Sequence, residues 1–259
     1  MRILQVGCGA LGGIVLKKYS QNYYQIEVID KFNAGGDFPN IPFYKDFNEL
    51  KNTQYDIIII SVKPQNYREI IDDLSNIISN KTTIISIMAG IDVDRLAMNF
   101  ANTQSFARIM PNIGMIFNAG VSSVYYRNCD KNIIDFVNIV FGGENILIKI
   151  DEDKTDTLTP IIGSGMVFFL LVGKILRSIA IEKFKIDENL ANNCIKNLLE
   201  SSFLFSKQDE NFEDTIKKIA SKGGITEEIC RTIENDLSIL LQNGVQNGIE
   251  KAIDLKKNF

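Results

Sequence analysis

The stretch MRILQVGCGALGG, residues 1–13, decides the fold of this chain. Its apolar run stops at a glycine, and the residues that follow fit the pattern GxGxxG, which is typical of a strand, a tight turn and a helix. Gly7 would form the turn, Gly9 would let the backbone approach a pyrophosphate, and Gly12 would let the helix pack closely on the strand. Free N–H groups at the helix start would then face the anion.

A second apolar run, residues 26–29, ends at Asp30, where the dinucleotide fingerprint requires an acidic residue. A carboxylate there can accept hydrogen bonds from the ribose hydroxyls of NADH and would repel the 2′-phosphate of NADPH, although Lys31 beside it could compensate. We therefore predict a dinucleotide site that leans toward NADH.

The overall composition is that of an ordinary soluble globular protein. The chain has 259 residues and a net charge of -4, and no block of like charge suggests a nucleic-acid or anionic-membrane surface. The N-terminus does not resemble a signal peptide, and the longest apolar stretch, 166–181, is interrupted by Lys174 and Arg177. We expect this stretch to be a buried or interface helix rather than a membrane span.

The cysteines and the absence of histidine limit the catalytic mechanisms and metal sites that this chain can have. The four cysteines show no CxxC pairing and are expected to be free thiols in a reducing cytoplasm. The chain contains no histidine, which excludes histidine-dependent nucleophilic catalysis and histidine metal sites. No metal site is predicted.

Residues 1–150 alternate strands and helices, which predicts an α/β domain with a doubly wound parallel sheet. Strands are expected at 26–30, 41–44, 57–60, 82–87, 103–109, 120–126 and 145–150, and helices at 10–20, 64–78, 92–99 and 132–141. Loops 62–65, 89–90 and 110–112 follow strands, so they should line the same rim as the turn at 7–12.

Residues 151–259 show helical periodicity, which predicts an all-α domain. Helices are expected at 152–182, 187–206, 211–219, 226–235 and 237–256. The first should bend or break near Pro160 and the glycines of 163–165, and Asp187 should cap the second.

Seven motifs, in this order and spacing, resemble the pyrroline-5-carboxylate reductase family over nearly the whole chain. They are GCGALG at 7–12, SVKPQ at 61–65, AG at 89–90, RIMPN at 108–112, NAGVSSV at 118–124, GSG at 163–165 and SKGGIT at 221–226. The resemblance implies a Rossmann-like domain that binds NAD(P)H, followed by an all-helical dimerisation domain. Many members of the family prefer NADPH, which conflicts with the lean toward NADH that Asp30 indicates. It also implies a homodimer through the C-terminal helices, with assembly of dimers into a larger ring left open. Each active site would combine one subunit's cofactor domain with the partner's helical domain.

The implied reaction is hydride transfer from NAD(P)H to the C=N bond of 1-pyrroline-5-carboxylate, giving L-proline. When the motifs of this chain are matched to those of the family, the hydroxyl of Thr226 is implied to reach the ring nitrogen of the substrate. The residues implied to hold the substrate carboxylate or line its pocket are Ser221, Gly223, Gly224, Ile225 and Asn112. Those implied to bind the cofactor are Gly7, Cys8, Gly9, Ala10, Leu11, Gly12, Asp30, Val62, Lys63, Pro64, Ala89 and Gly90. An imine can enter already protonated, so one hydroxyl can suffice where a ketone would need a histidine or lysine acid.

Simpler explanations exist for several of these residues. Ser221 could be a helix N-cap and Thr226 an ordinary first-turn residue, while Asn112 could stabilise a turn, Pro64 could serve only to start a helix and Lys63 could be merely solvated. Three positions depart from the family pattern, which has proline at Met166 and Lys222 and tyrosine at Phe168. They leave open a reductase of another cyclic imine or a catalytically weak NAD-binding regulatory dimer.

Overall fold

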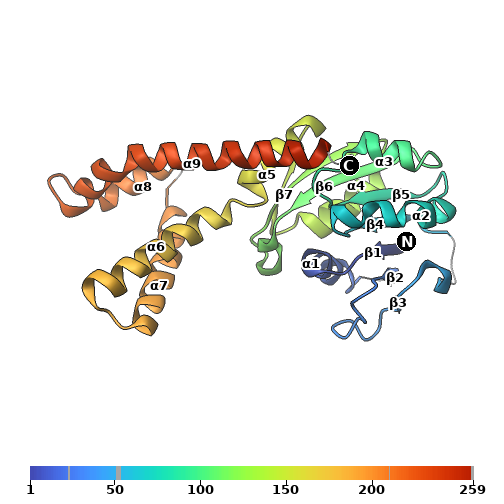
Figure 1. Ribbon diagram of the computed structural model, residues 1–259, viewed down its shortest axis with the longest axis horizontal. Coiled ribbons are helices and arrows are strands. Elements are labelled where there is room, and N and C mark those ends of the chain that lie inside the picture. The colour runs from blue at the N-terminus through green and yellow to red at the C-terminus, as the bar shows by residue number, and fades with distance from the viewer. Residues whose placement is uncertain (23, 51–53, 210, 258–259) are drawn as a thin grey trace. The chain divides into compact units, whose positions relative to one another are not determined.

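One mixed sheet carries the first part of the chain (Figure 1). This computed structural model describes residues 1–22, 24–50, 54–209 and 211–257, and its eight strands are ordered β3-β2-β1-β4-β5-β6-β7-β8. The strands are β1 (Arg2–Val6), β2 (Gln25–Ile29), β3 (Phe43–Tyr44), β4 (Ile57–Ile60), β5 (Thr83–Ser86), β6 (Ser105–Pro111), β7 (Val121–Arg127) and β8 (Ile146–Lys149). The predicted α/β fold is confirmed.

The sheet is parallel from β3 to β6 only. Strand β7 pairs antiparallel with β6, and β8 is parallel to β7. The prediction of a wholly parallel sheet is therefore wrong for its last two strands. A parallel connection needs a crossover of a dozen or more residues, whereas residues 112–120 hold only the short 3-10 helix η3 (Ile113–Phe117). The chain therefore returns antiparallel.

Helices cover both faces of the sheet, which explains the unbroken isoleucine run of β4. Ile57 and Ile59 pack in the cluster that includes α1 (Ala10–Tyr19) and α4 (Lys131–Phe141). Ile58 and Ile60 pack in the cluster that includes α2 (Ile71–Ile77) and α3 (Val93–Asn99). Because successive side chains of a strand point to opposite faces, a strand covered on both sides must be apolar throughout.

The helix predicted over 64–78 has two parts. The 3-10 helix η2 (Pro64–Ile70) comes first and continues into α2, and a further 3-10 helix, η1 (Phe47–Glu49), precedes β4. Pro64 stands at the first helical position, as expected from its fixed φ and missing N–H.

The chain divides into two compact units. The first contains Met1–Ser164 and Gly248–Phe259, and the second contains Gly165–Asn247. The helices after the sheet are α5 (Glu152–Ile162), α6 (Met166–Phe184), α7 (Glu188–Ser206), α8 (Phe212–Ile219) and α9 (Ile225–Lys257). The predicted break at 163–165 is confirmed, and Asp187 caps α7 by accepting hydrogen bonds from the N–H groups of Asn189 and Leu190.

The prediction of two helices at 226–235 and 237–256 is wrong, because α9 is continuous. Asn235 and Asp236, which lie at the predicted break, have low helix propensity. In a helix interior each of these residues is less favourable than alanine by about 0.7 kcal/mol. Helix formation is cooperative, so a helix that has already formed continues through two such residues.

The second unit exposes many apolar side chains. Phe169, Leu170 and Ile175 of α6 are each more than half exposed. By length and composition alone, the helical stretch Glu152–Phe184 would suffice to cross a membrane, with a mean hydropathy of 1.8 in its most apolar window. Within the unit, α6 packs on α7 at Gly173, where a side chain would come within 3.3 Å of Leu199 and Ile195.

Candidate active site

The glycine turn after β1 has the geometry that its sequence predicts. Gly7 has a φ of +94°, and a Cβ there would lie 2.8 Å from the backbone of Ser61 and Val62. A Cβ on Gly12 would lie 2.9 Å from the carbonyl oxygen of Gly7, whereas a Cβ on Gly9 would meet nothing within 4 Å. Gly7 and Gly12 are therefore required by packing, and Gly9 keeps the start of α1 open.

Hydrogen bonds from Gln5, Tyr19 and Ser61 stabilise this turn on its buried side. Gln5 Nε2 donates to the carbonyl oxygens of both Gly7 and Gly12 at 2.9 Å, and Tyr19 donates its hydroxyl hydrogen to Gln5 Oε1 at 2.7 Å. Ser61 Oγ donates to the Gly7 carbonyl at 2.5 Å. This support was not predicted from the sequence, although a glutamine inside the apolar run of β1 was the available signal. Burial raises the pKa of Tyr19 well above its ordinary value, so it stays protonated as a donor.

Asp30 lies directly after β2, and its carboxylate is tied to the turn. Oδ2 accepts a hydrogen bond from the Cys8 N–H at 2.6 Å, and Oδ1 accepts from the N–H groups of Phe32 and Asn33 at 2.8 and 2.7 Å. Burial alone would raise the pKa of Asp30, but these three hydrogen bonds and the charge of Lys45 hold it below its ordinary value. A carboxylate offers about four acceptor positions, so one remains for a ligand hydroxyl.

Cys8 itself is not a reactive thiol. It is buried in the turn, and burial, with the charges of Asp30 and Asp37, raises its pKa to about 11. The thiolate is the nucleophilic form, so at neutral pH Cys8 acts as a small apolar side chain.

A cavity of about 370 Å³ opens at the carboxyl ends of β1, β2 and β4. It brings together five residues predicted to bind the cofactor: Gly7, Gly9, Asp30, Val62 and Lys63. A ligand crevice at this edge is what an open α/β sheet provides.

Three other predicted residues follow β5 and β6 at the same edge, outside the lining of this cavity. Ala89 and Gly90 form a turn in which Gly90 has a φ of +74° and packs against the end of α9, at Leu255 and Lys256. Asn112 is buried: its Nδ2 donates to the Ile162 carbonyl at 2.9 Å, and its Oδ1 accepts from the N–H groups of Gly114 and Val121. The amide of Asn112 therefore holds the chain in place around the end of β6.

The loop at 221–226 lies in the second compact unit and leads into α9. The Gly224 N–H donates to the Ser221 carbonyl at 2.9 Å, and Gly223 has a φ of +72°, which favours glycine. Thr226 is half-buried in the first turn of α9, and no hydrogen bond within the described part of the chain ties down its hydroxyl. The Gly223 N–H donates to Glu227 Oε2 at 2.6 Å.

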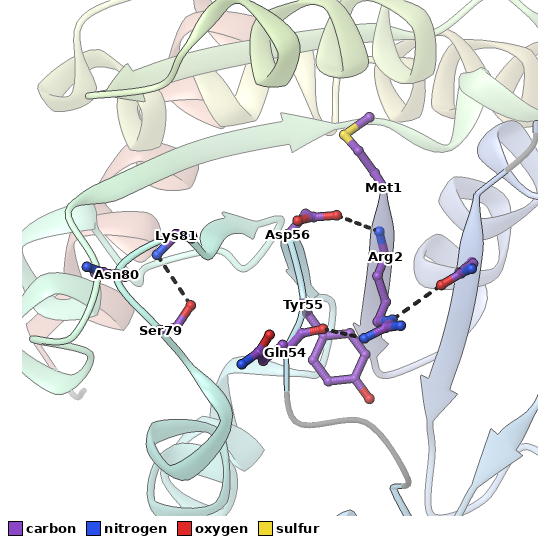
Figure 2. Close-up of a pocket in the computed structure, with 9 residues that line it drawn as sticks. Met1, Arg2, Gln54, Tyr55, Asp56, Ser79, Asn80 and Lys81 are labelled. Atoms are coloured by element: carbon purple, nitrogen blue, oxygen red, sulfur yellow. Dashed lines mark hydrogen bonds between the residues drawn. The ribbon is translucent and has the colours of Figure 1, made fainter.

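A second cavity lies at the opposite edge of the sheet (Figure 2). It has a volume of about 570 Å³ and is lined by residues at the amino ends of the strands, among them Arg2 and Asp56. Its polar groups bond to one another: the Arg2 N–H donates to Asp56 Oδ2 at 2.7 Å, and the Arg2 guanidinium donates to the Gln54 carbonyl. None of the predicted site residues lines this cavity, and ligands of open α/β sheets bind at the other edge.

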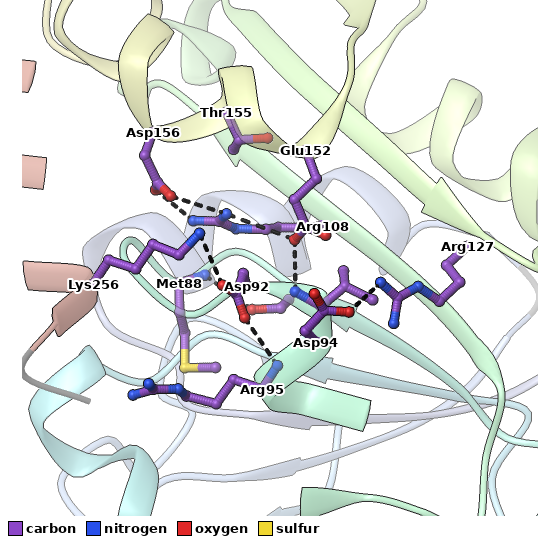
Figure 3. A network of polar contacts seen from close by, with 12 residues as sticks. Met88, Asp92, Asp94, Arg95, Arg108, Arg127, Glu152, Thr155, Asp156 and Lys256 are labelled. Atoms are coloured by element: carbon purple, nitrogen blue, oxygen red, sulfur yellow. Dashed lines mark hydrogen bonds and ion pairs between the residues drawn. The ribbon is translucent and has the colours of Figure 1, made fainter. Parts of the chain in front are cut away.

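A buried ion-pair network joins β6 to α5 (Figure 3). The fully buried Arg108 donates to both carboxylate oxygens of Asp156, at 2.5 and 3.2 Å, and Glu152 lies 3.7 Å away. Burial raises the pKa of Glu152, although its carboxylate also accepts the Val93 N–H at 2.6 Å. Arg108 belongs to one of the family motifs, but no partner was predicted for it from the sequence. Its signal was a lone arginine inside an apolar strand.

Known proteins are similar to this chain over most of its length. A family model described as pyrroline-5-carboxylate reductase dimerisation matches residues 152–255. Pyrroline-5-carboxylate reductase from Staphylococcus haemolyticus is 25% identical over 221 residues, covering 83% of this chain and 79% of that protein. Pyrroline-5-carboxylate reductase from Staphylococcus aureus is 26% identical over 218 residues, covering 82% of this chain and 78% of that protein.

Solved structures share the fold. Plasmodium falciparum pyrroline carboxylate reductase with NADP bound has a TM-score of 0.85 at 20% identity, with 99% of this chain and 98% of that chain covered. The Streptococcus pyogenes 1-pyrroline-5-carboxylate reductase has a TM-score of 0.81 at 20% identity, with 98% of each covered. Together with the motifs and the dimerisation segment, these comparisons show that the chain is similar to pyrroline-5-carboxylate reductases over most of its length and shares their fold.

Proposed function

We propose that this protein is an NAD(P)H-dependent imine reductase that converts 1-pyrroline-5-carboxylate to L-proline. The observation that carries the proposal is the loop at 221–226, whose turn leads into a helix with the Thr226 hydroxyl in its first turn. In the family that the motifs resemble, that hydroxyl is the group expected at the substrate nitrogen. The domain division proposed is a cofactor domain at 1–150 and a helical substrate and dimerisation domain at 151–259.

The residues around the glycine turn fit a dinucleotide. Gly9 leaves open space where a side chain would stand, and α1 begins without a side-chain cap or an acidic residue in its first turn. The pyrophosphate would lie on those N–H groups, the remaining acceptor position of Asp30 would receive a ribose hydroxyl, and Val62, Lys63, Ala89 and Gly90 would line the nicotinamide side. When bound, the cofactor supplies the hydride.

The remaining chemistry falls to the protein. The turn at Ser221, Gly223 and Gly224 would orient the substrate by its carboxylate, because backbone N–H groups at a helix start favour an anion. The Thr226 hydroxyl would hydrogen-bond to the ring nitrogen and hold the proton there. A protonated C=N bond is the more electrophilic form, so this one contact favours hydride acceptance at the adjacent carbon.

Weak discrimination between cofactors, leaning toward NADH, follows from Asp30. Its carboxylate would repel a 2′-phosphate, but Lys31 and Lys45 line the same cavity, and Lys31 is only held by an exposed pair with Glu69 at 2.9 Å. A kcat/KM for NADPH more than about tenfold above that for NADH would contradict this, since tenfold corresponds to about 1.4 kcal/mol.

A homodimer explains the apolar surface of the second unit. The exposed side chains of α6 lie in the segment matched by the dimerisation model, and an exposed apolar surface of this kind is typical of an obligate partner. We propose that a second copy of the chain covers this surface. Burial against that copy would also explain why the helical stretch Glu152–Phe184 is apolar enough to cross a membrane. A cytoplasmic location fits the free thiols of all four cysteines.

Oxidation of NADH and NADPH, followed with 1-pyrroline-5-carboxylate and a panel of other imines, tests the proposal. We expect turnover with 1-pyrroline-5-carboxylate. Preference for another imine would favour the alternative that Met166, Phe168 and Lys222 suggest. Cofactor binding without turnover of any imine would contradict an enzymatic function and favour a regulatory NAD-binding dimer.

A further inference from the structure

The loop at 221–226 already holds a carboxylate of its own chain. Glu227 stands in the first turn of α9, and its Oε2 accepts the Gly223 N–H at 2.6 Å, a short distance for an N–H···O bond. The positive φ of Gly223 turns the backbone so that this N–H faces the start of the helix. The Gly224 N–H is engaged with the Ser221 carbonyl.

The neighbouring carboxylate behaves differently. Glu228 pairs with Arg231 on the next turn at 2.6 Å, and it also accepts a hydrogen bond from Arg231 Nε at 3.0 Å. Hydrogen bonds from Arg231 lower the pKa of Glu228. Of two adjacent acidic residues, one is neutralised by a guanidinium and the other is directed at the loop.

We propose that Glu227 is a specificity-determining residue that competes with the substrate carboxylate for the Gly223 N–H. An anion that binds the loop must displace Glu227 and tolerate its charge nearby, so this residue weakens binding of imines that carry a carboxylate. It does not touch the reacting C=N bond. The inference rests on the proposed function for its substrate class.

Steady-state kinetics of Glu227→Ala with two imines tests the inference. The substrates are 1-pyrroline-5-carboxylate and 1-pyrroline, which share a ring and differ in the carboxylate. We expect the KM for 1-pyrroline-5-carboxylate to fall about three- to tenfold with kcat unchanged, because a competitor that opposes the ground and transition states equally changes KM alone. The KM for 1-pyrroline should stay within about twofold of its wild-type value.

Glu228→Ala is the matched control, since it removes the same charge one residue along the same helix. It should leave both KM values within about twofold of wild type, because that charge is already paired. The inference is wrong if Glu227→Ala leaves the KM for 1-pyrroline-5-carboxylate unchanged, lowers both KM values equally, or behaves like Glu228→Ala. Both side chains are exposed, so both variants should fold, which thermal unfolding verifies.

Calorimetric binding of L-proline in the presence of oxidised cofactor separates this inference from the proposed function. If the wild-type protein reduces neither imine, the proposed function fails. A Kd for L-proline about three- to tenfold lower in Glu227→Ala would still uphold the competition. An equal Kd in the two proteins would overturn it.

Discussion

At the scale of single residues, the chemistry proposed for this protein depends on one hydroxyl. We expect Thr226→Ala to lower kcat about 100-fold while the Kd for NADH stays nearly unchanged, because the variant loses only the hydrogen bond to the ring nitrogen. Thr226→Ser keeps the hydroxyl and should retain kcat within about tenfold of wild type. Stopped-flow turnover and fluorescence titration of NADH measure the two quantities. Unchanged turnover in Thr226→Ala would remove this residue from the mechanism.

Asp30 makes the stability of the cofactor turn depend on pH. Its pKa is lowered in the folded protein, so the stability that it contributes is fully present above its unfolded pKa of about 4 and is lost as the pH falls through the folded value. Asp30→Asn places a donor against the Cys8 N–H and should cost about 1–2 kcal/mol at pH 7, after allowance for partial exposure.

The difference in Tm between wild type and Asp30→Asn should therefore stay constant from pH 7 to about 5 and shrink as the pH falls further, through the lowered folded pKa of Asp30, below which both side chains are neutral. Asp37→Asn, which removes an exposed carboxylate from the loop after β2, serves as the control. A Tm difference that does not shrink at the lower pH would show that the charge of Asp30 does not stabilise the turn.

At the scale of elements, Arg108 fastens α5 to β6. Asp156→Ala would leave a fully buried guanidinium whose remaining ion-pair partner among the described residues is Glu152, 3.7 Å away, so we expect it to lower the free energy of unfolding by about 3–5 kcal/mol. The pair Lys154–Asp151 on the surface of α5 gives the control, and Asp151→Ala should cost less than about 1 kcal/mol. Urea denaturation measures both. A similar cost for the two variants would mean that the buried network contributes little.

Two polar atoms of the same network make no hydrogen bond to the described part of the protein. Within the described residues, Arg108 Nε and the Thr155 hydroxyl are both buried without a hydrogen-bond partner. Buried polar atoms of this kind are usually satisfied by ordered water. Such a water would add to the cost of disturbing this junction.

Local patterns predicted most of these elements, and long-range geometry decided the rest. The four isoleucines of β4 and the glycine turn were sufficient to predict a buried strand and a dinucleotide fold. The antiparallel return of β7 follows from the short connection between the strands predicted at 103–109 and 120–126, which is too short for a parallel crossover and which the prediction of a parallel sheet did not take into account. The continuity of α9 depends on cooperativity that outweighs the low helix propensity of Asn235 and Asp236.

Short motifs also predicted the residues that face the proposed ligand, but they did not predict the residues that support them. Asp30 and the glycines follow a short motif, and the structure gathers five of the predicted cofactor residues around one cavity. Ser61, which supports the turn, and the partner of Arg108 make tertiary contacts between segments far apart in the sequence. Gln5 lies close in sequence to the carbonyls that it bonds, but the fold of the turn brings those carbonyls to its side chain. No spacing rule reveals such contacts, although a polar residue within an apolar strand marks where to look.

At the scale of the whole molecule, the site proposed here requires two chains. The family resemblance implies that one subunit's cofactor domain works with the partner's loop at 221–226. Two inactive variants test this arrangement. Gly9→Leu should fold, because a Cβ at Gly9 meets nothing within 4 Å, but its side chain would occupy the space of the pyrophosphate. Thr226→Ala keeps the cofactor turn and lacks the hydroxyl.

Subunits of the two variants, mixed after reversible dissociation, should regain activity if each site takes residues from both chains. About half of the dimers would be mixed, and one of the two sites in each mixed dimer would combine an intact turn with an intact Thr226, giving about a quarter of wild-type activity. If each site formed within one chain, every site in the mixture would carry one of the two defects. The absence of recovered NADH oxidation, with mixed dimers confirmed by native mass spectrometry, would therefore contradict a shared site.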